Sequence, residues 1–199
     1  MSDWSQEVEK YATVVQGCRV LVFEDLDRLA QIFDLSRREA EIAALELGVL
    51  PRRYLRNYGT LGIEGQLVLA RAHVAVIGLG GLGGFVVEGL ARMGVGRLTL
   101  VDGDVFVDHN LNRQLLSSEN LLGTPKADAA AARVRQINVA VDVTACAVYA
   151  SHENLDNLLA CVDVVVDALD RLPIRMTLQD TAARLNLPMV HGAIAGTMG

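Results

Sequence analysis

From residue 73 onward the chain alternates short apolar runs with stretches that carry apolar residues at helical spacing. The runs VAVI and LTLV are short and largely β-branched or leucine, as expected of strands buried on both faces. We predict strands at residues 74–77, 98–101, 141–147, 162–168 and 189–193, and helices at residues 85–93, 125–137, 153–159 and 171–185. Strands that alternate with helices predict an α/β fold with a doubly wound, mainly parallel, Rossmann-like sheet and right-handed crossovers.

The first 50 residues follow a different pattern, with apolar positions three and four apart, and predict an N-terminal helical appendage. We expect a helix over residues 3–16, a short strand over 20–23 and a second helix near 26–33. A third helix opens at Ser36, where Glu39 completes a capping box, and ends near Gly48. Residues 51–72 are interpreted as a linker that ends in a short apolar helix.

A glycine-rich turn follows the first apolar run of the α/β part, in the stretch VAVIGLGGLGG. Gly78, Gly80 and Gly83 form the pattern G-x-G-x-x-G, with Gly81 as an additional glycine. A strand, a glycine turn and a helix start make a phosphate cradle, because the backbone approaches the anion without a Cβ in the way. Alone the pattern also fits a turn that packs a helix on a strand. Asp102, nineteen residues past Gly83 at the next strand end, is placed to bind ribose and favours nucleotide binding.

Further polar residues cluster after the strands. Asn110, Arg113 and Gln114 stand in HNLNRQ, Lys126 opens a helix in GTPKADAA, and Asp170 follows an apolar strand. Arginine suits bidentate oxyanion recognition, lysine supplies a compact charge for a phosphate, and a carboxylate suits Mg²⁺. Each residue alone could be a solvated loop side chain or a helix cap. Because ligands bind outside the carboxyl ends of parallel strands, the set favours a site for a triphosphate and a magnesium ion.

Composition narrows the functional classes. The 199 residues are 51% hydrophobic with mean hydropathy +0.30, which indicates a globular chain. No apolar run approaches the ~20 residues of a membrane helix, and no secretion signal is visible, so we expect a cytoplasmic protein without a membrane partner.

Cys18, Cys146 and Cys161 form no C-x-x-C pair, which indicates neither a disulfide framework nor a zinc site, and we expect Cys146 and Cys161 in the core. His109 and His191 are interpreted as structural.

Charge argues against a nucleic-acid partner. The net charge is −6, and residues 1–48 hold ten acidic and five basic side chains, a net charge of −5. The two helices near 26–47 have the outline of a helix-turn-helix unit, but this charge would repel a phosphate backbone. We therefore interpret the segment as an appendage for packing or partner contact.

From about residue 53 to residue 199, the motifs RYLRN, EGQ, the glycine turn, DGD, NLNRQ, GTPKADAA and VVVDALD follow one another in order. In these motifs the chain resembles the ThiF/MoeB/HesA adenylyltransferases, relatives of the ubiquitin-activating enzymes. NLNRQ and the lysine at the helix start are far more specific than the turn. The resemblance implies adenylation of the C-terminal Gly-Gly carboxylate of a small ubiquitin-like or sulfur-carrier protein with Mg-ATP, and release of pyrophosphate.

The resemblance also implies roles for individual residues. Gly80 and Gly81 would face the phosphates and Asp102 would take the ribose. Asn110, Arg113 and Lys126 would hold the triphosphate, and Asp170 the magnesium. Arg56, in RYLRN, would reach the phosphates of the other subunit in a homodimer.

Two departures from the family and two alternative functions remain open at this stage. Family members continue well beyond residue 199, so residues 51–199 are expected to be a C-terminally truncated adenylation domain, and residues 1–50 match nothing in the family core. An NAD(P)-dependent oxidoreductase could use the same turn and Asp102, but it leaves NLNRQ and Lys126 unexplained. A non-catalytic nucleotide-binding scaffold is the other alternative. The carrier protein and its pathway are not encoded in these motifs.

Overall fold

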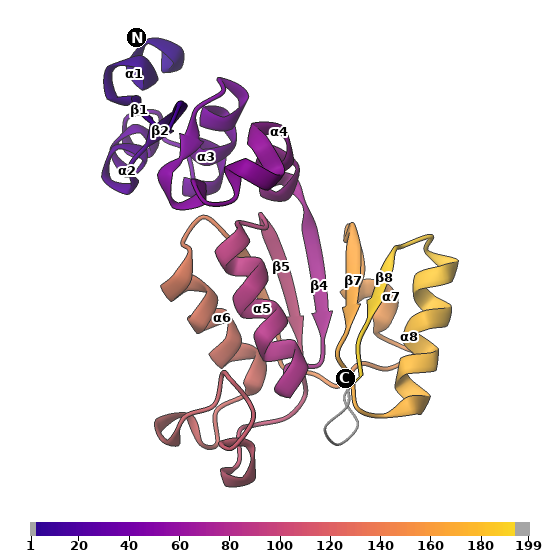
Figure 1. The fold of residues 1–199 in the computed structure, drawn as a ribbon. Helices are drawn as coiled ribbons and strands as arrows, with labels where there is room; N and C mark the ends of the chain where they lie inside the picture. Colours follow the sequence, from indigo (N-terminus) through magenta and orange to yellow (C-terminus); the bar gives the residue numbers. More distant parts are fainter. Residues whose placement is uncertain (1–2, 194–199) are drawn as a thin grey trace.

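The computed structural model describes residues 3–193, and its centre is a five-stranded, all-parallel sheet with strand order β6–β5–β4–β7–β8 (Figure 1). The strands are β4 (His73–Ile77), β5 (Arg97–Val101), β6 (Asp142–Cys146), β7 (Val164–Asp167) and β8 (Met189–His191). The helices between them are α5 (Gly81–Met93), α6 (Lys126–Ile137), α7 (Leu155–Leu158) and α8 (Leu172–Arg184). The predicted α/β fold is confirmed.

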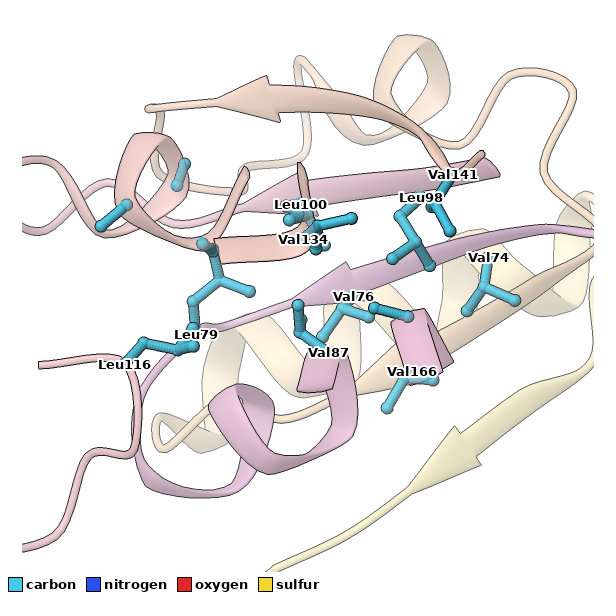
Figure 2. Close-up of a cluster of buried hydrophobic side chains, with 14 of the residues drawn as sticks. Val74, Val76, Leu79, Val87, Leu98, Leu100, Leu116, Val134, Val141 and Val166 are labelled. Carbon is cyan, nitrogen blue, oxygen red and sulfur yellow. The ribbon is translucent and has the colours of Figure 1, made fainter. Parts of the chain in front are cut away.

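Both faces of this sheet are buried, which explains the unbroken apolar runs. Side chains of a strand alternate between its faces. Val76 and Leu100 therefore pack with Val87 of α5 and Val134 of α6, in the cluster shown in Figure 2. Residues of opposite parity on the same strands pack with α7 and α8 on the other face, among them Ala75, Ile77 and Val101. The alternating order of helices and strands thus produces two apolar layers around one sheet.

The N-terminal part contains α1 (Trp4–Tyr11), α2 (Phe23–Ile32) and α3 (Arg37–Glu46), together with a small three-stranded sheet. Its strands are β1 (Thr13–Val15), β2 (Cys18–Leu21) and β3 (Leu50–Pro51). The helix predicted over residues 3–16 is therefore wrong beyond Tyr11. Gln16 and Gly17 have φ of 52° and 77°, and this turn folds the β-branched Thr13–Val15 onto β2 as a hairpin. The capping box of Ser36 and Glu39 is present as predicted.

Residues 51–72 pack firmly and do not behave as a loose linker. A 3₁₀ turn, η1 (Arg52–Tyr54), precedes α4 (Tyr58–Arg71), which is kinked at Gly62, where φ is 64°. The Tyr54 side chain is buried with Leu50, Leu45 and Ala70, so one apolar cluster extends to both sides of residue 50. Two further 3₁₀ turns, η2 (Asp108–Asn110) and η3 (Glu119–Leu121), punctuate the irregular loop between β5 and α6.

The cysteine prediction is half correct. Cys146 is partly buried and packs against the core on the α7–α8 face, whereas Cys161 is exposed. Cys161 has φ of 61° in the turn before β7, a position at the surface where the chain reverses direction. Within residues 3–193, no helix combines the length and the apolar character that are needed to cross a membrane.

A buried polar network joins the N-terminal part to the α/β part. The Tyr54 hydroxyl donates a hydrogen bond of 2.9 Å to Glu41 of α3 and accepts one of 2.8 Å from Asn138, at the end of α6. The Asn138 amide also donates to the carbonyl of Ala91. Glu41 is only 3% exposed, so its carboxyl group is shielded from water.

Glu41 makes stability depend on pH. Burial raises the pKa of the Glu41 carboxyl, so the folded chain binds this proton more tightly than the unfolded chain. The free energy of unfolding is therefore expected to fall as the pH rises from about 4.3, the usual glutamate value, through the raised pKa. Glu41→Gln keeps an acceptor for Tyr54 and should flatten this fall, whereas Glu64→Gln at an exposed position should not. Urea unfolding between pH 5 and pH 8 checks this, and equal slopes in wild type and Glu41→Gln would contradict it.

Candidate active site

A cleft of about 840 Å³ lies beyond the carboxyl ends of β4, β5 and β7. It is where the strand order predicts a ligand site, because the chain runs from β4 to β5 on one side and later returns from β6 to β7 on the other side of β4. Eight of the predicted site residues line it: Gly78, Gly80, Gly81, Asp102, Arg113, Gln114, Lys126 and Asp170. The fold thus brings together residues from five separate segments of the chain.

The glycines of the turn have two different roles. Gly80 and Gly81 stand at the N-terminal end of α5, and a Cβ added to Gly80 would come no closer than 3.6 Å to another atom, the Gln114 amide nitrogen. These positions leave room for a phosphate in front of the free N–H groups of the helix. Gly78 has φ of 92°, and a Cβ on Gly83 would lie 1.9 Å from the Gly78 carbonyl oxygen. Gly78 and Gly83 therefore allow the tight turn itself, and Gly83 does not line the cleft.

Asp102 links the turn to the end of β5. One of its carboxylate oxygens accepts a 2.7 Å hydrogen bond from the Leu79 N–H, and the other accepts a 2.8 Å bond from the Asp104 N–H. Each carboxylate oxygen can accept more than one hydrogen bond. Asp102 can therefore hold the glycine turn and still accept hydrogen bonds from ribose hydroxyls in the cleft.

The NLNRQ segment splits between loop structure and cleft. Asn110 is 3% exposed and lies outside the cleft lining, and its side-chain oxygen accepts from the Val107 N–H at 3.1 Å. The Asn110 carbonyl accepts from the backbone N–H groups of Arg113 and Gln114, so Asn110 shapes the loop that presents these two residues. Its predicted contact with a triphosphate stays a prediction.

Arg113 and Gln114 both line the cleft, but Arg113 is exposed and Gln114 is buried. Arg113 is exposed, and its guanidinium donates to the His109 carbonyl at 2.6 Å and to Asn112 at 3.0 Å. Gln114 is buried, and its side-chain oxygen has no hydrogen-bond partner among residues 3–193. A buried acceptor without a partner is costly to the folded state.

Lys126 is the most enclosed cation of the cleft. It opens α6, it is 6% exposed, and its ammonium donates a 3.1 Å hydrogen bond to Asp104. The Tyr149 hydroxyl donates to the other Asp104 oxygen at 2.7 Å. These two hydrogen bonds, that of Tyr149 foremost, hold the pKa of the Asp104 carboxyl below its usual range. Asp104 and Tyr149 were missed at the sequence level; the second acid of DGD was a signal for Asp104, whereas nothing in the pattern marked Tyr149.

On the opposite side of the cleft, Asp170 is exposed and offers one carboxylate. No group of three or more His, Cys, Asp or Glu side chains is placed to hold a metal ion within the described part of the chain. Mg²⁺ is commonly held by one or two carboxylates together with phosphate oxygens and water. Asp170 fits that mode of binding and does not fit an all-protein metal cage.

Next to Asp170, the structure shows an ionic cluster of Asp167, Arg175 and His191 that the sequence did not predict. Asp167, at the end of β7, is fully buried; it accepts a 3.0 Å hydrogen bond from Arg175 and lies 2.8 Å from the His191 ring. Arg175 also donates to the Gly192 carbonyl at 2.7 Å. The cluster fixes the start of the chain after β8 against the end of β7. His191 thus has Asp167 as a partner, which the sequence did not indicate, and its structural role stays a prediction.

Arg56 lies at the other end of the sheet. It is exposed on the turn before α4, and α4 leads directly into the start of β4, whereas the cleft lies past the end of that strand (Figure 1). It does not line the cleft of its own chain. A contact between Arg56 and a bound triphosphate would therefore require a second subunit.

Comparison with known proteins identifies the family. The family model described as "ThiF family" matches residues 54–199, which include every residue of this cleft. The chain belongs to the ThiF family. Related ThiF-family proteins include the SAMP-activating enzyme E1 of Haloferax volcanii, 43% identical over 144 residues, and the sulfur carrier protein adenylyltransferase of Thermus thermophilus, 42% identical over 134 residues.

A solved structure supports the same assignment. The E. coli tRNA N6-threonylcarbamoyladenosine dehydratase TcdA, in complex with ATP, matches with a TM-score of 0.70 and 32% identity over 73% of this chain and 60% of that chain. The Haloferax match covers 71% of this chain and 53% of the relative, and the Thermus match covers 67% and 49%. The chain thus spans about half the length of these two relatives.

Proposed function

We propose that this ThiF-family chain adenylates the C-terminal Gly-Gly carboxylate of a small ubiquitin-like or sulfur-carrier protein, with Mg-ATP as the second substrate and pyrophosphate as a product. The observation that carries the proposal is one cleft that combines the free helix end at Gly80 and Gly81 with Asp102, Lys126 and Asp170. The names of the Haloferax and Thermus relatives support a carrier-activating reaction, and an ATP complex of a structural relative supports the nucleotide.

The chemistry of this step suits the residues of the cleft. A carboxylate oxygen of the carrier attacks the α-phosphorus of ATP, and the bond from that phosphorus to the bridging oxygen breaks as pyrophosphate leaves. An anion approaches a polyanion, so charge neutralisation and in-line placement matter more than an acid–base pair. Arg113 and Lys126 would supply positive charge from one side of the cleft. Asp170 would hold a Mg²⁺ that neutralises phosphate charge, and no side-chain nucleophile is needed for this step.

Two other functions use the same cleft less well. An NAD(P)-dependent oxidoreductase needs only one pyrophosphate bridge, which leaves Arg113, Lys126 and Asp170 without a role. A non-catalytic nucleotide-binding scaffold would keep ATP binding without turnover. Pyrophosphate exchange in the presence of candidate carriers separates the scaffold from the enzyme, because exchange requires a reversible adenylate.

We expect the cleft to bind Mg-ATP more tightly than NAD. The reason is the excess of positive charge and metal-binding capacity over what two phosphates require. Calorimetric titration with each ligand measures the preference, and adenosine serves as the control for the base and ribose. Tighter binding of NAD than of Mg-ATP would remove the adenylation proposal.

The proposal extends to a cytoplasmic homodimer, without a membrane or nucleic-acid partner, in which Arg56 acts on the neighbouring cleft. Its support is the exposed position of Arg56 at the end of the sheet away from its own cleft. Mixing inactive Arg56→Ala subunits with inactive Lys126→Ala subunits should restore adenylation, because one of the two mixed clefts would carry both residues intact. An active protein that sediments as a monomer would refute the arrangement.

A further inference from the structure

Tyr149 occupies an unusual place in the cleft. It stands in the loop after β6, where its backbone carbonyl accepts from the Asn154 side chain at 2.9 Å. Its ring lies against Gly103: a Cβ added there would come within 2.5 Å of the Tyr149 ring. The side chain is nevertheless 67% exposed and lines the cleft. Such exposure indicates that core packing does not explain the position of Tyr149.

The hydroxyl of Tyr149 is connected to Lys126 through Asp104. Asp104 accepts 2.7 Å from Tyr149 on one oxygen and 3.1 Å from the Lys126 ammonium on the other. Backbone pairing holds Asp104 and Lys126 side by side, because the Lys126 N–H donates to the Asp104 carbonyl at 2.9 Å and Val105 forms a bridge with Pro125. The Asp104 side chain itself is half exposed. Among the described residues, the Tyr149 hydroxyl is the side-chain group, besides Lys126 itself, that holds the Asp104 carboxylate.

We propose that Tyr149 is a positioning residue for Lys126, and that its hydroxyl holds the Asp104 carboxylate in the orientation that directs the Lys126 ammonium toward bound phosphate. The inference rests on the proposed binding of a nucleotide triphosphate in this cleft. A lysine ammonium carries three N–H donors on a flexible four-carbon stem. Asp104 engages one donor and leaves two for phosphate oxygens. Ordering the ammonium in advance reduces the entropy lost when the phosphate binds.

The charges of the cleft fix the direction of these hydrogen bonds at neutral pH. The pKa of Asp104 is lowered, first by the Tyr149 hydroxyl and then by Lys126, so Asp104 is a carboxylate and accepts both bonds. The pKa of the Tyr149 phenol is raised by the same carboxylate, so Tyr149 remains the donor. Arg171 and Asp102 are the other charged groups that act on this pair.

A double-mutant cycle in the whole chain tests the inference, with inorganic tripolyphosphate binding as a readout that needs neither carrier nor turnover. Tyr149→Phe keeps the ring and removes only the hydroxyl. Loss of one such hydrogen bond is expected to weaken tripolyphosphate binding about three- to tenfold, and to have no further effect in a Lys126→Met background. Tyr58→Phe, an exposed tyrosine on α4, is the matched control and should change nothing. In pyrophosphate exchange, Tyr149→Phe should lower kcat by a similar factor.

The carboxyl pKa of Asp104, followed by NMR in the ligand-free protein, should rise in Tyr149→Phe. The inference is overturned if Tyr149→Phe leaves binding unchanged, if its effect is equally large without Lys126, or if wild type binds no tripolyphosphate. Absence of exchange with every carrier tested, together with an intact binding cycle, would instead remove the proposed adenylation and leave the positioning role in place.

Discussion

Replacing Lys126 with methionine is expected to lower the rate of adenylation on the order of 10²–10³-fold, by analogy with removal of one preorganised oxyanion donor. Charge accumulates on the α-phosphate and on the departing pyrophosphate as the transition state forms. A donor aimed at that charge contributes more in the transition state than in the ground state, so the loss should appear mainly in kcat. Arg113→Ala is expected to have an effect of similar size for the same reason.

The burial of Lys126 decides which substitution is informative. Arg113 is an exposed cation, as expected of a loop residue, and contributes little to stability. Lys126 is 6% exposed, so alanine would also remove its packed aliphatic stem. Methionine keeps an unbranched apolar chain of similar length. After this change Asp104 keeps the Tyr149 hydrogen bond and remains half exposed to water, so the melting temperature should change little.

Pyrophosphate exchange and thermal melting of both variants measure these effects. Wild-type exchange rates in Lys126→Met and Arg113→Ala would show that the two residues are not the phosphate clamp. Loss of exchange that is fully matched by loss of folded protein would instead indicate a structural role for the substituted residue.

Alanine at Gly83 and alanine at Gly80 are expected to damage the protein in opposite ways. A Cβ on Gly83 would lie 1.9 Å from the Gly78 carbonyl oxygen, so the turn must open or α5 must shift. Overpacking of this kind costs about 1–3 kcal/mol, and more where the neighbour is rigid backbone. Gly83→Ala should therefore melt well below wild type.

Gly80→Ala should keep the fold and lose the ligand. The nearest atom to an added Cβ is the Gln114 amide nitrogen at 3.6 Å, an ordinary contact distance. The methyl group would instead occupy space in front of the N-terminal end of α5, where a phosphate would approach. Melting curves and Mg-ATP calorimetry on both variants compare the two effects. Wild-type stability of Gly83→Ala would contradict the role of the turn, and wild-type Mg-ATP affinity of Gly80→Ala would contradict the position of the phosphates.

Much of the α/β part followed from sequence alone, because its signals are local. Strand runs such as 74–77, the glycine turn, the acid at the end of β5 and the lysine at the start of α6 each depend on spacing within a few residues. The position of ligand sites in parallel sheets then brought Gly80, Asp102, Lys126 and Asp170 to one edge without knowledge of side-chain contacts. The helix predicted over residues 3–16 failed because a turn at Gln16–Gly17 offered strand pairing, which helical spacing does not reveal.

The sequence by itself determined the sheet, the glycine turn and the edge at which charged residues gather. Tertiary structure alone decided which of those residues touch. Tyr149 meets Asp104 across 45 residues, and Asp167 meets His191 across 24, through loops whose course no periodic pattern describes. Asn110 turned inward to hold its loop, although its motif had suggested a ligand contact. The reason is physical: periodicity records which face of an element is buried, whereas hydrogen bonds between loops depend on how the finished sheet places their ends.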